Sequence, residues 1–373
     1  MKILHIIDSD GIYGAEVMLL NLMREHVLMG HEPIILSIED NHNESKYSLY
    51  QEATKRGLSA IKVELKRGFR PGSSALFMKI AKENSIDIIH SHGYKGNILL
   101  GIIPKIQRST PVISTIHGWT SVRKFSKLWI YSLLDKFFLK RLDAVVYVNP
   151  LTPNVIHHKK AFHIDNGIPE HQFNRQIIEK TDQETVKFCQ DGYIIGCISR
   201  LSEEKGIANL IEAISLALNK LPDIKLLIIG DGPLLNELKQ LVNKYGISSS
   251  VLFSGYRENA YNYLAFFDLF ILPSITEGLP ITVLEAMQAS VPVIATKVGA
   301  IPKVLANGDN GIIVNPNDSR SIEKAIYLAR SQPELLKFMI IRSKNDVAEK
   351  YSCHRMANDY INVYNKVMNN GKH

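Results

Sequence analysis

The feature that most constrains the fold is an alternation of short apolar runs with stretches of helical periodicity. In the first half, runs at 3–7, 33–38, 87–90, 111–116 and 144–148 have the length and composition of buried strands. Between the first two of these runs, apolar residues recur at helical spacing. Strands separated by helices pair into a parallel sheet. The first half is therefore predicted to be an α/β domain wound around a parallel sheet.

The second half repeats this alternation. A buried-strand pattern at 193–199 precedes a helical pattern, and further strand-like runs follow at 225–230, 251–256, 266–272, 291–296 and 310–314. A chain of 373 residues is long enough for two ordinary domains. The polar stretch 171–192 lacks strong apolar periodicity. We therefore predict a first domain at 1–170, a linker at 171–192 and a second domain at 193–353.

Composition limits the class of protein. The chain is 45% hydrophobic and 22% charged, and its apolar runs are shorter than the roughly 18 residues that a membrane-spanning helix needs. The N-terminal apolar run is too short for a signal peptide. The three cysteines, Cys189, Cys197 and Cys353, are widely spaced and odd in number. We therefore expect a cytoplasmic protein without a disulfide framework.

The basic charge is concentrated in the first half. The whole chain carries a formal charge of +7, and residues 1–170 hold 22 Lys+Arg against 16 Asp+Glu, or +6. The segment 121–141 mixes cations with aromatic residues. As a helix it could rest on the inner face of an anionic membrane, or it could be an ordinary helix with a solvated basic face. We expect no nucleic-acid partner, because no recognised nucleic-acid module accompanies these charges.

The stretch 276–286 has the pattern of an anion pocket. It runs from a buried strand ending at Pro273 into a helix, and Pro280 suits the first helical position, where a missing amide costs no hydrogen bond. Free amides and the positive end of the helix dipole would face a ligand, and Gly278 would allow close approach. Glu277 would lie at the mouth of the loop. Glu285 would reach a more distant group such as ribose hydroxyls.

Two other sets of polar residues follow strands. Arg200 and Lys205 flank a loop, where two cations can clamp a diphosphate. His90, His92 and His117 also follow or end strands, at the edge where open α/β sheets bind ligands. We expect no metal site at His90 and His92, because no third ligand stands at a convincing spacing. These two histidines are therefore predicted to be structural.

These motifs together resemble the retaining family-4 glycosyltransferases. The pair Glu277 and Glu285, with Gly-Leu-Pro between them and Glu-Ala-Met at the end, is similar to the signature of that family, and Arg200-x4-Lys205-Gly resembles its diphosphate-binding pair. The loop before Gly14 resembles the family's Gly-Gly-x-Glu turn, although Tyr13 replaces its first glycine.

The resemblance implies a fold and a site. The fold would be GT-B, with two Rossmann-like domains facing across a cleft and a C-terminal helix, about 354–373, packing back on the first domain. The catalytic residues would be Glu277, His117, Arg200 and Lys205. The nucleotide-sugar donor would be bound by Gly14, Arg200, Lys205, Tyr256, Arg257, Glu277, Gly278, Leu279, Pro280, Ile281, Thr282 and Glu285.

The resemblance also implies an activity. The enzyme would move a sugar from a nucleotide diphosphate sugar, UDP favoured over GDP, to a glycan or lipid-linked acceptor in cell-surface polysaccharide biosynthesis. It would need neither a cofactor nor a metal. A nucleotide-sugar epimerase of the same fold and a non-catalytic nucleotide-sugar-binding relative are the alternatives.

Overall fold

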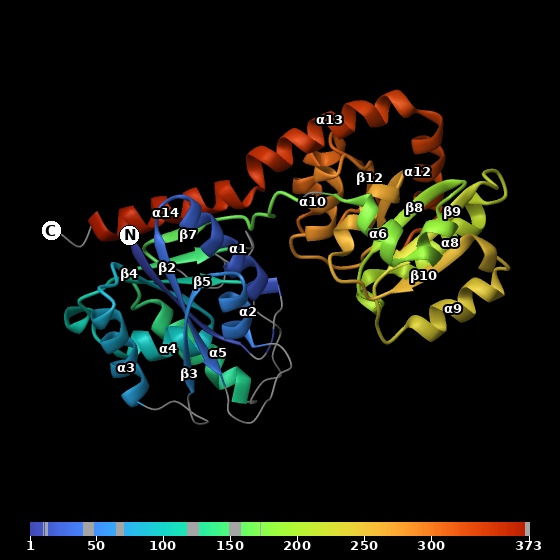
Figure 1. Ribbon diagram of the computed structural model, residues 1–373. Coiled ribbons are helices and arrows are strands. Elements are labelled where there is room, and N and C mark those ends of the chain that lie inside the picture. The colour runs from blue at the N-terminus through green and yellow to red at the C-terminus, as the bar shows by residue number, and fades with distance from the viewer. Residues whose placement is uncertain are drawn as a thin grey trace. The chain divides into compact units, whose positions relative to one another are not determined.

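A computed structural model describes residues 1–9, 11, 14–39, 48–64, 71–117, 127–148, 158–171 and 173–369 (Figure 1). The chain forms two compact units. The first comprises Met1–Pro169 and Ser352–His373, and the second is Glu170–Tyr351. Among the described residues no helix is both long and apolar enough to cross a membrane.

The first unit is built on a parallel sheet of seven strands in the order β3-β2-β1-β4-β5-β6-β7. Its strands are β1 (Lys2–Asp8), β2 (Glu32–Glu39), β3 (Ser59–Glu64), β4 (Ile88–His92), β5 (Val112–Ile116), β6 (Ala144–Tyr147) and β7 (Ala161–His163). Its helices are α1 (Gly14–Leu28), α2 (Leu49–Lys55), α3 (Pro71–Glu83), α4 (Tyr94–Ile102), the short η1 (Lys105–Gln107), α5 (Lys127–Leu139) and α14 (Cys353–Asn369).

Helices cover both faces of this sheet. Alternate strand residues such as Leu4 and Ile6 pack against α3, α4 and α5, whereas Ile3 packs against α1 and α14. Helix α2 joins α1 over the part of the second face that includes Ile7 and Ile35. The two-residue period of a strand therefore sorts the β1 side chains between two helical layers.

The second unit has a parallel sheet of six strands in the order β10-β9-β8-β11-β12-β13. These are β8 (Tyr193–Ile198), β9 (Ile224–Ile229), β10 (Val251–Gly255), β11 (Leu269–Leu272), β12 (Val293–Thr296) and β13 (Ile312–Val314). The helices are α6 (Arg175–Thr181), α7 (Gln183–Phe188), η3 (Glu203–Lys205), α8 (Ile207–Ala217), α9 (Leu235–Lys244), η4 (Ser248–Ser250), η5 (Ala260–Phe266), α10 (Ile281–Gln288), α11 (Ile301–Val304), η6 (Ala306–Gly308), α12 (Ser319–Ser331) and α13 (Pro333–Lys350).

The main core of this unit joins one sheet face mainly to three helices, with Leu336 of α13 at its margin. Ile195, Leu226 and Leu269 contribute from the strands, and α8, α9 and α12 contribute the helical layer. The prediction of two Rossmann-like α/β domains with parallel sheets is confirmed. Strands β3 and β7 were not predicted, because β3 carries polar residues on an edge and β7 has three residues.

The prediction that 171–192 is a linker between the two domains is wrong. Helices α6 and α7 lie within this stretch, and both belong to the second unit. The side chains of Asn174 and Asp182 cap the two helices by accepting hydrogen bonds from their first-turn amides. These short helices are held by caps and by polar contacts with the rest of the unit, which apolar periodicity does not reveal.

Candidate functional site

The second sheet reverses its strand order between β8 and β11. From β8 the chain moves outward to β9 and β10, and from β11 it moves outward on the other side to β12 and β13. Loops at such a switch point diverge and leave a crevice beyond the strand C-termini, where ligands bind in open α/β sheets. The loop after β8 contains Arg200 and Lys205, and the loop after β11 contains Glu277.

An ion pair joins these two loops. Nζ of Lys205 lies 2.5 Å from Oε1 of Glu277, and Oγ of Ser274 donates to the same oxygen at 2.8 Å. The Glu277 side chain is only 9% exposed, so it is held rather than freely solvated. The second oxygen, Oε2, accepts no hydrogen bond from the residues that the structure describes. The structure therefore brings together two of the predicted site residues, which are 72 positions apart in the chain.

Backbone contacts fix the spacing of the same loops. The amides of Ile275 and Thr276 donate to the carbonyl oxygen of Glu204 at 2.8 and 3.4 Å. Gly206 is the N-cap of α8 and has a φ of +63°, and a Cβ there would lie 2.3 Å from the carbonyl oxygen of Pro273. A glycine is therefore required beside Lys205 both for its left-handed conformation and for the close passage of the second loop.

Replacing Gly206 by alanine is expected to destabilise the second unit by about 3 kcal/mol, because it adds a backbone clash to left-handed strain. Gly246→Ala is the matched control. Gly246 also has a positive φ, +68°, but a Cβ there meets nothing within 4 Å, so its cost should be about 1 kcal/mol. Urea unfolding of both variants by circular dichroism measures the difference. Equal costs would show that the contact with Pro273 does not constrain the loops.

Helix α10 begins one residue later than predicted. Pro280 is its N-cap rather than its first helical residue, and the carbonyl of Pro280 accepts hydrogen bonds from the amides of Val283 and Leu284. The reason is its ψ of 91°, which lies outside the helical range. The first amides of the helix, Ile281 and Thr282, have no partner within it, as at any helix start. An anion placed here would face these amides and the dipole.

The other residues of the predicted pocket surround this helix start. Ile281 is 39% exposed and Leu279 half-buried, and a Cβ at Gly278 would meet no described atom within 4 Å. The folded loop therefore does not itself fill the space beside Gly278. This space is open for a ligand to approach the backbone.

Glu285 lies further along α10 and has a neighbour that the sequence did not indicate. Nε2 of His171 lies 3.5 Å from Oε1 of Glu285, and both side chains are largely buried. The His171 ring stacks on Tyr261 with centroids 3.8 Å apart, and the amide of His171 donates to Gln288. Because His171 fell in the stretch predicted as a linker, no sequence pattern placed it beside Glu285.

The two cations of the first loop differ in their surroundings. Lys205 is bound by Glu277, whereas the Arg200 side chain is exposed, and no ion pair within 4.0 Å joins it to a residue in the described parts of the chain. Arg200 therefore keeps its guanidinium available for an anionic ligand.

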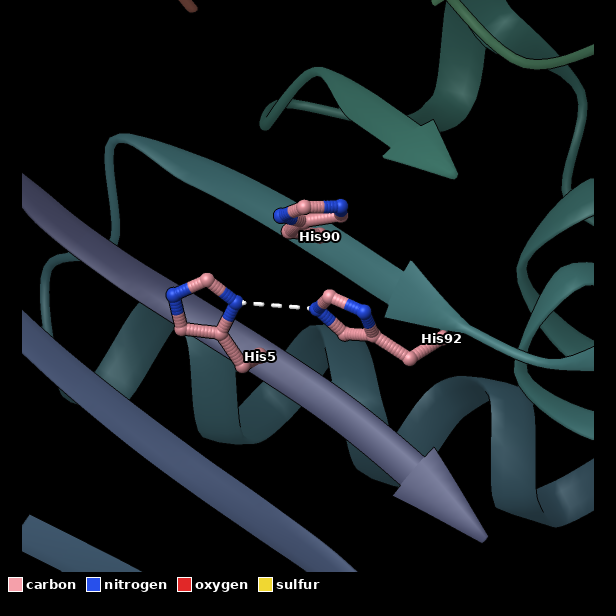
Figure 2. A group of neighbouring side chains, drawn as sticks. All are labelled: His5, His90 and His92. Carbon is pink, nitrogen blue, oxygen red and sulfur yellow. Dashed lines mark hydrogen bonds between the residues drawn. The ribbon is translucent and has the colours of Figure 1, made fainter. Parts of the chain in front are cut away.

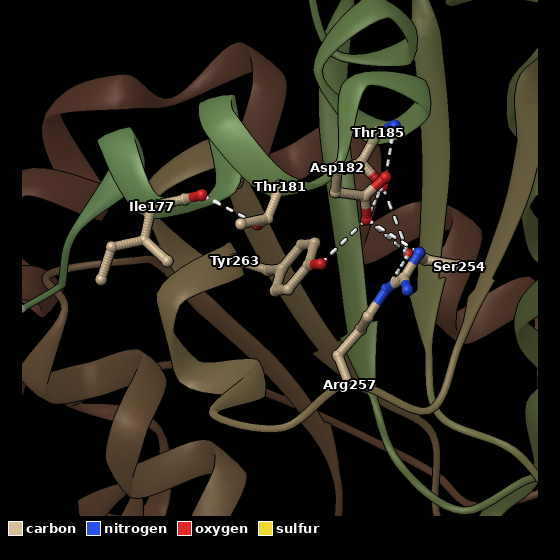
Figure 3. A network of polar contacts seen from close by, with 7 residues as sticks. All are labelled: Ile177, Thr181, Asp182, Thr185, Ser254, Arg257 and Tyr263. Atoms are coloured by element: carbon tan, nitrogen blue, oxygen red, sulfur yellow. Dashed lines mark hydrogen bonds and ion pairs between the residues drawn. The ribbon is translucent and has the colours of Figure 1, made fainter.

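Arg257, predicted to bind the nucleotide-sugar donor, uses its side chain within the unit (Figure 3). Its Nη2 lies 3.0 Å from Oδ2 of Asp182, and its Nε donates to Oγ of Ser254. Thr185 and Tyr263 also donate to Asp182. Burial opposes ionisation of Asp182, but these hydrogen bonds and the charge of Arg257 lower its pKa.

The Asp182 network shapes the turn that presents Tyr256. Because Asp182 caps α7 and also holds Ser254 and Arg257, it ties α7 to the end of β10 and to the turn after it. Tyr256 lies between those two residues and is 76% exposed. The backbone of this turn is therefore positioned, while the Tyr256 ring remains accessible.

In the first unit, three buried histidines come together on the face covered by α1 and α14 (Figure 2). His5 from β1 joins His90 and His92 from β4, with possible ligand nitrogens all within 4.8 Å. The sequence argument that no third ligand accompanies His90 and His92 is therefore wrong. His5 was missed because it is distant in sequence, although β1 and β4 are neighbours and pair His5 with His90.

Hydrogen bonds already occupy most of these nitrogens. His90 pairs with the hydroxyls of Tyr364 and Thr115, both at 2.8 Å. Nδ1 of His5 and Nε2 of His92 lie 3.1 Å apart. A metal ion would have to displace these bonds, so the arrangement favours a hydrogen-bonded cluster.

The remaining predicted residues of the first unit are His117 and Gly14. His117 is half-buried, directly follows β5, and its Nε2 lies 3.1 Å from Nδ1 of His92. Burial lowers the pKa of His117 to about 4, so its ring is neutral at pH 7. Gly14 begins α1, and a Cβ there would meet no described atom within 4 Å. The preceding Tyr13 lies outside the described residues.

Two family models match the chain. Residues 12–171 match the model described as Glycosyltransferase Family 4, and residues 178–346 match the model described as Glycosyl transferases group 1. The structure is also similar to that of HepE from Anabaena, solved in complex with UDP, with a TM-score of 0.81 and 19% identity over 98% of this chain and 100% of that one. The fold is that of the GT-B glycosyltransferases.

Curated relatives agree with this class. The chain is 27% identical over 301 residues to the N-acetyl-alpha-D-glucosaminyl L-malate synthase of Bacillus anthracis, covering 79% of this chain and 78% of the relative. It is 24% identical over 307 residues to the UDP-Gal:alpha-D-GlcNAc-diphosphoundecaprenol alpha-1,3-galactosyltransferase of Escherichia coli, covering 77% of each. The chain belongs to the family-4 glycosyltransferases and is a glycosyltransferase.

Proposed function

We propose that this glycosyltransferase moves a sugar from UDP-sugar, with retention of configuration, to a glycan or lipid-linked acceptor. The observation that carries the proposal is the Lys205–Glu277 pair at the switch point of the second sheet. It places a cation and a carboxylate at one crevice, beside the free amides that begin α10. A sugar diphosphate needs both kinds of group, since its phosphates are anionic and its sugar is rich in hydroxyl donors.

The cations and amides would stabilise the leaving group. As the glycosidic bond breaks, negative charge grows on the diphosphate, and groups already aimed at that charge lower the barrier. Exposed Arg200 offers a bidentate guanidinium, and Lys205 offers a point charge. The helix start adds amide donors and its dipole. These groups supply the stabilisation without a metal ion, and we propose that none is needed.

Glu277 would orient the donor sugar. Its Oε1 is taken by Lys205 and Ser274, which leaves Oε2 to accept from sugar hydroxyls. Glu277 need not attack the anomeric carbon. Retention then follows if the acceptor approaches the face that the diphosphate leaves and the diphosphate takes the acceptor's proton. His117 of the first unit would hydrogen-bond a sugar hydroxyl through its neutral imidazole.

The names of relatives support the nucleotide and the acceptor class. UDP is present in the Anabaena structure and in the name of the Escherichia coli enzyme, whose acceptor is a diphosphoundecaprenol lipid. We therefore propose UDP over GDP and a role in making a cell-surface polysaccharide. Four apolar side chains of α5 are exposed near Lys140 and Arg141, which supports peripheral contact with the inner face of a membrane. They are Ile130, Leu133, Leu134 and Phe137. The part of the basic segment at 121–126 lies outside the described residues.

Calorimetry with UDP, GDP and their sugars, in the presence of EDTA, tests the donor site. Wild type is expected to bind UDP, and Glu285→Ala to bind it roughly 10- to 100-fold more weakly, because a hydrogen bond to a charged group is lost. Glu237→Ala is the control. Glu237 is an exposed glutamate near the start of α9 in the same unit, and its loss should leave binding unchanged.

The outcomes separate the alternatives. Failure of every nucleotide to bind would overturn the proposed donor site, and dependence on a metal would appear as loss of binding in EDTA. UDP-sugar binding followed by epimer formation without transfer would favour the epimerase. Binding without any turnover would favour a non-catalytic relative.

A further inference from the structure

Three histidines form a diagonal across adjacent strands of the first sheet. The strands β1, β4 and β5 are neighbours, and their register pairs His5 with His90 and His92 with Thr115. His92 therefore lies two residues beyond the partner of His5, and His117 lies two residues beyond the partner of His92. Since side chains two apart share a face, all three point to the layer of α1 and α14. The diagonal rises toward the strand C-termini, the edge where such sheets bind ligands.

Hydrogen bonds join the three rings into a single chain. Nδ1 of His5 lies 3.1 Å from Nε2 of His92, and Nδ1 of His92 lies 3.1 Å from Nε2 of His117. Each link uses one proton, because one nitrogen of a neutral imidazole donates and the other accepts. The direction of one hydrogen bond therefore fixes the direction of the other. If His92 donates through Nδ1 it must accept through Nε2, so its protonation state fixes both neighbours.

The two ends of the chain differ. At the inner end, Nε2 of His5 is buried and has no hydrogen-bond partner. At the outer end, Nδ1 of His117 has no hydrogen bond to any residue that the structure describes, and its ring is partly exposed. If all three rings carried the proton on Nε2, His5 would hold an N–H with no acceptor in the core. Buried donors without an acceptor are the rarest unsatisfied groups in proteins. If all three rings instead carried the proton on Nδ1, the buried Nε2 of His5 would hold only a lone pair without a partner.

We propose that His5 and His92 are positioning residues that hold His117 in its Nδ1–H form, so that His117 presents a hydrogen-bond donor at the outer end of the chain. The chain consists of three Nδ1–H tautomers in sequence. His117 can then donate to a sugar oxygen without accepting from a sugar hydroxyl at the same nitrogen. This consequence for sugar recognition rests on the proposed function, whereas the tautomers themselves do not.

The surroundings keep the chain neutral. Burial lowers the pKa of His5 and His92 well below the usual range, with a further contribution from neighbouring histidines. His90 does not compete for the links, because its two nitrogens pair with Tyr364 and Thr115. The cluster is therefore a set of neutral rings with one open end.

Long-range proton–nitrogen NMR of the full chain, labelled with 15N-histidine, tests the proposal at neutral pH without substrate. Each tautomer gives a distinct pattern of ring-nitrogen shifts and couplings to the carbon-bound protons. The expected result is Nδ1–H for His5, His92 and His117 together. An Nε2–H form of His117, or an even mixture of its two forms, would overturn the proposal. The wild-type spectrum decides this alone, so the test survives if a variant fails to fold.

A pair of variants tests the coupling. His5→Phe removes the inner ring that donates to His92, and the Nδ1–H fraction of His117 is expected to fall. His26→Phe is the matched control, because His26 is equally buried and stacks against His5 with centroids 6.0 Å apart but lies outside the three linked rings. An unchanged His117 spectrum in His5→Phe would refute the coupling. Neither NMR measurement contains a sugar donor or an acceptor substrate. Loss of enzyme activity would therefore not change the wild-type result or the result for the two variants.

Discussion

Replacement of Lys205 by methionine is expected to lower the rate of sugar transfer by about 10²- to 10³-fold, the usual cost of removing a group that stabilises charge in the transition state. Lys205 is half-buried at the switch point and contacts Glu277 at 2.5 Å, so water cannot easily replace it. Steady-state kinetics with UDP-sugar and an acceptor measure the change. Lys239→Met, which changes an exposed lysine of α9, should leave the rate unaltered.

A double variant separates two roles of Lys205. Removing Lys205 also leaves Glu277 without its cation, so part of the loss could come from an uncompensated carboxylate. The variant Lys205→Met/Glu277→Gln removes that charge as well. If Lys205 only neutralises Glu277, the double variant will be as active as Glu277→Gln alone. We expect it to be much less active, because the diphosphate still lacks its cation.

Acid is expected to unfold the first unit before the second. Four fully buried histidines have lowered pKa values, with that of His26 at about 3, chiefly because burial disfavours the charged ring. The unfolded chain binds protons at these groups below about pH 6.5, whereas the native unit does not, so stability falls as pH falls. Each group contributes about 1.4 kcal/mol per pH unit. The free energy of unfolding should therefore drop by about 5 kcal/mol between pH 5.5 and 4.5.

Tryptophan fluorescence during urea unfolding can measure this loss. Both tryptophans, Trp119 and Trp129, lie in the sequence of the first unit. The variant His26→Phe should lower the pH dependence by about one histidine's share, about 1.4 kcal/mol per pH unit. If the free energy of unfolding of the wild type changed by no more than about 1.4 kcal/mol per pH unit, the histidines would be accepting protons in the folded unit.

The sequence predicted the parallel α/β class because that class depends on local patterns, and the prediction of the pocket residues rests on a local pattern as well. Alternating periodicity marks strands and helices, and the spacing of Glu277 to Glu285 is a property of one loop and helix. The contact of Lys205 with Glu277 needed the strand order, since it joins loops that become neighbours only when β8 pairs with β11.

The need to know which parts of the chain become neighbours also explains which residues the sequence did not predict. His5 lies in the middle of a strand that reads as apolar, and only the pairing of β1 with β4 brings it to His92. Asp182 and His171 lie in a polar stretch whose helices depend on caps and distant partners. Residues that act through contacts across the chain leave no periodic signal, whereas those that act through one loop do.

The position of α14 has a consequence for the order in which the chain folds. Tyr360 and Tyr364 of this helix are fully buried in the first unit and bond to Thr115 and His90, yet the whole second unit separates them from those partners in the chain. Domains generally fold as they emerge during synthesis, N-terminal first. Here every residue of the second unit is synthesised before the first unit receives its last helix. The second unit can therefore be folded on the ribosome while the first still exposes the part of the histidine-bearing sheet face that α14 covers.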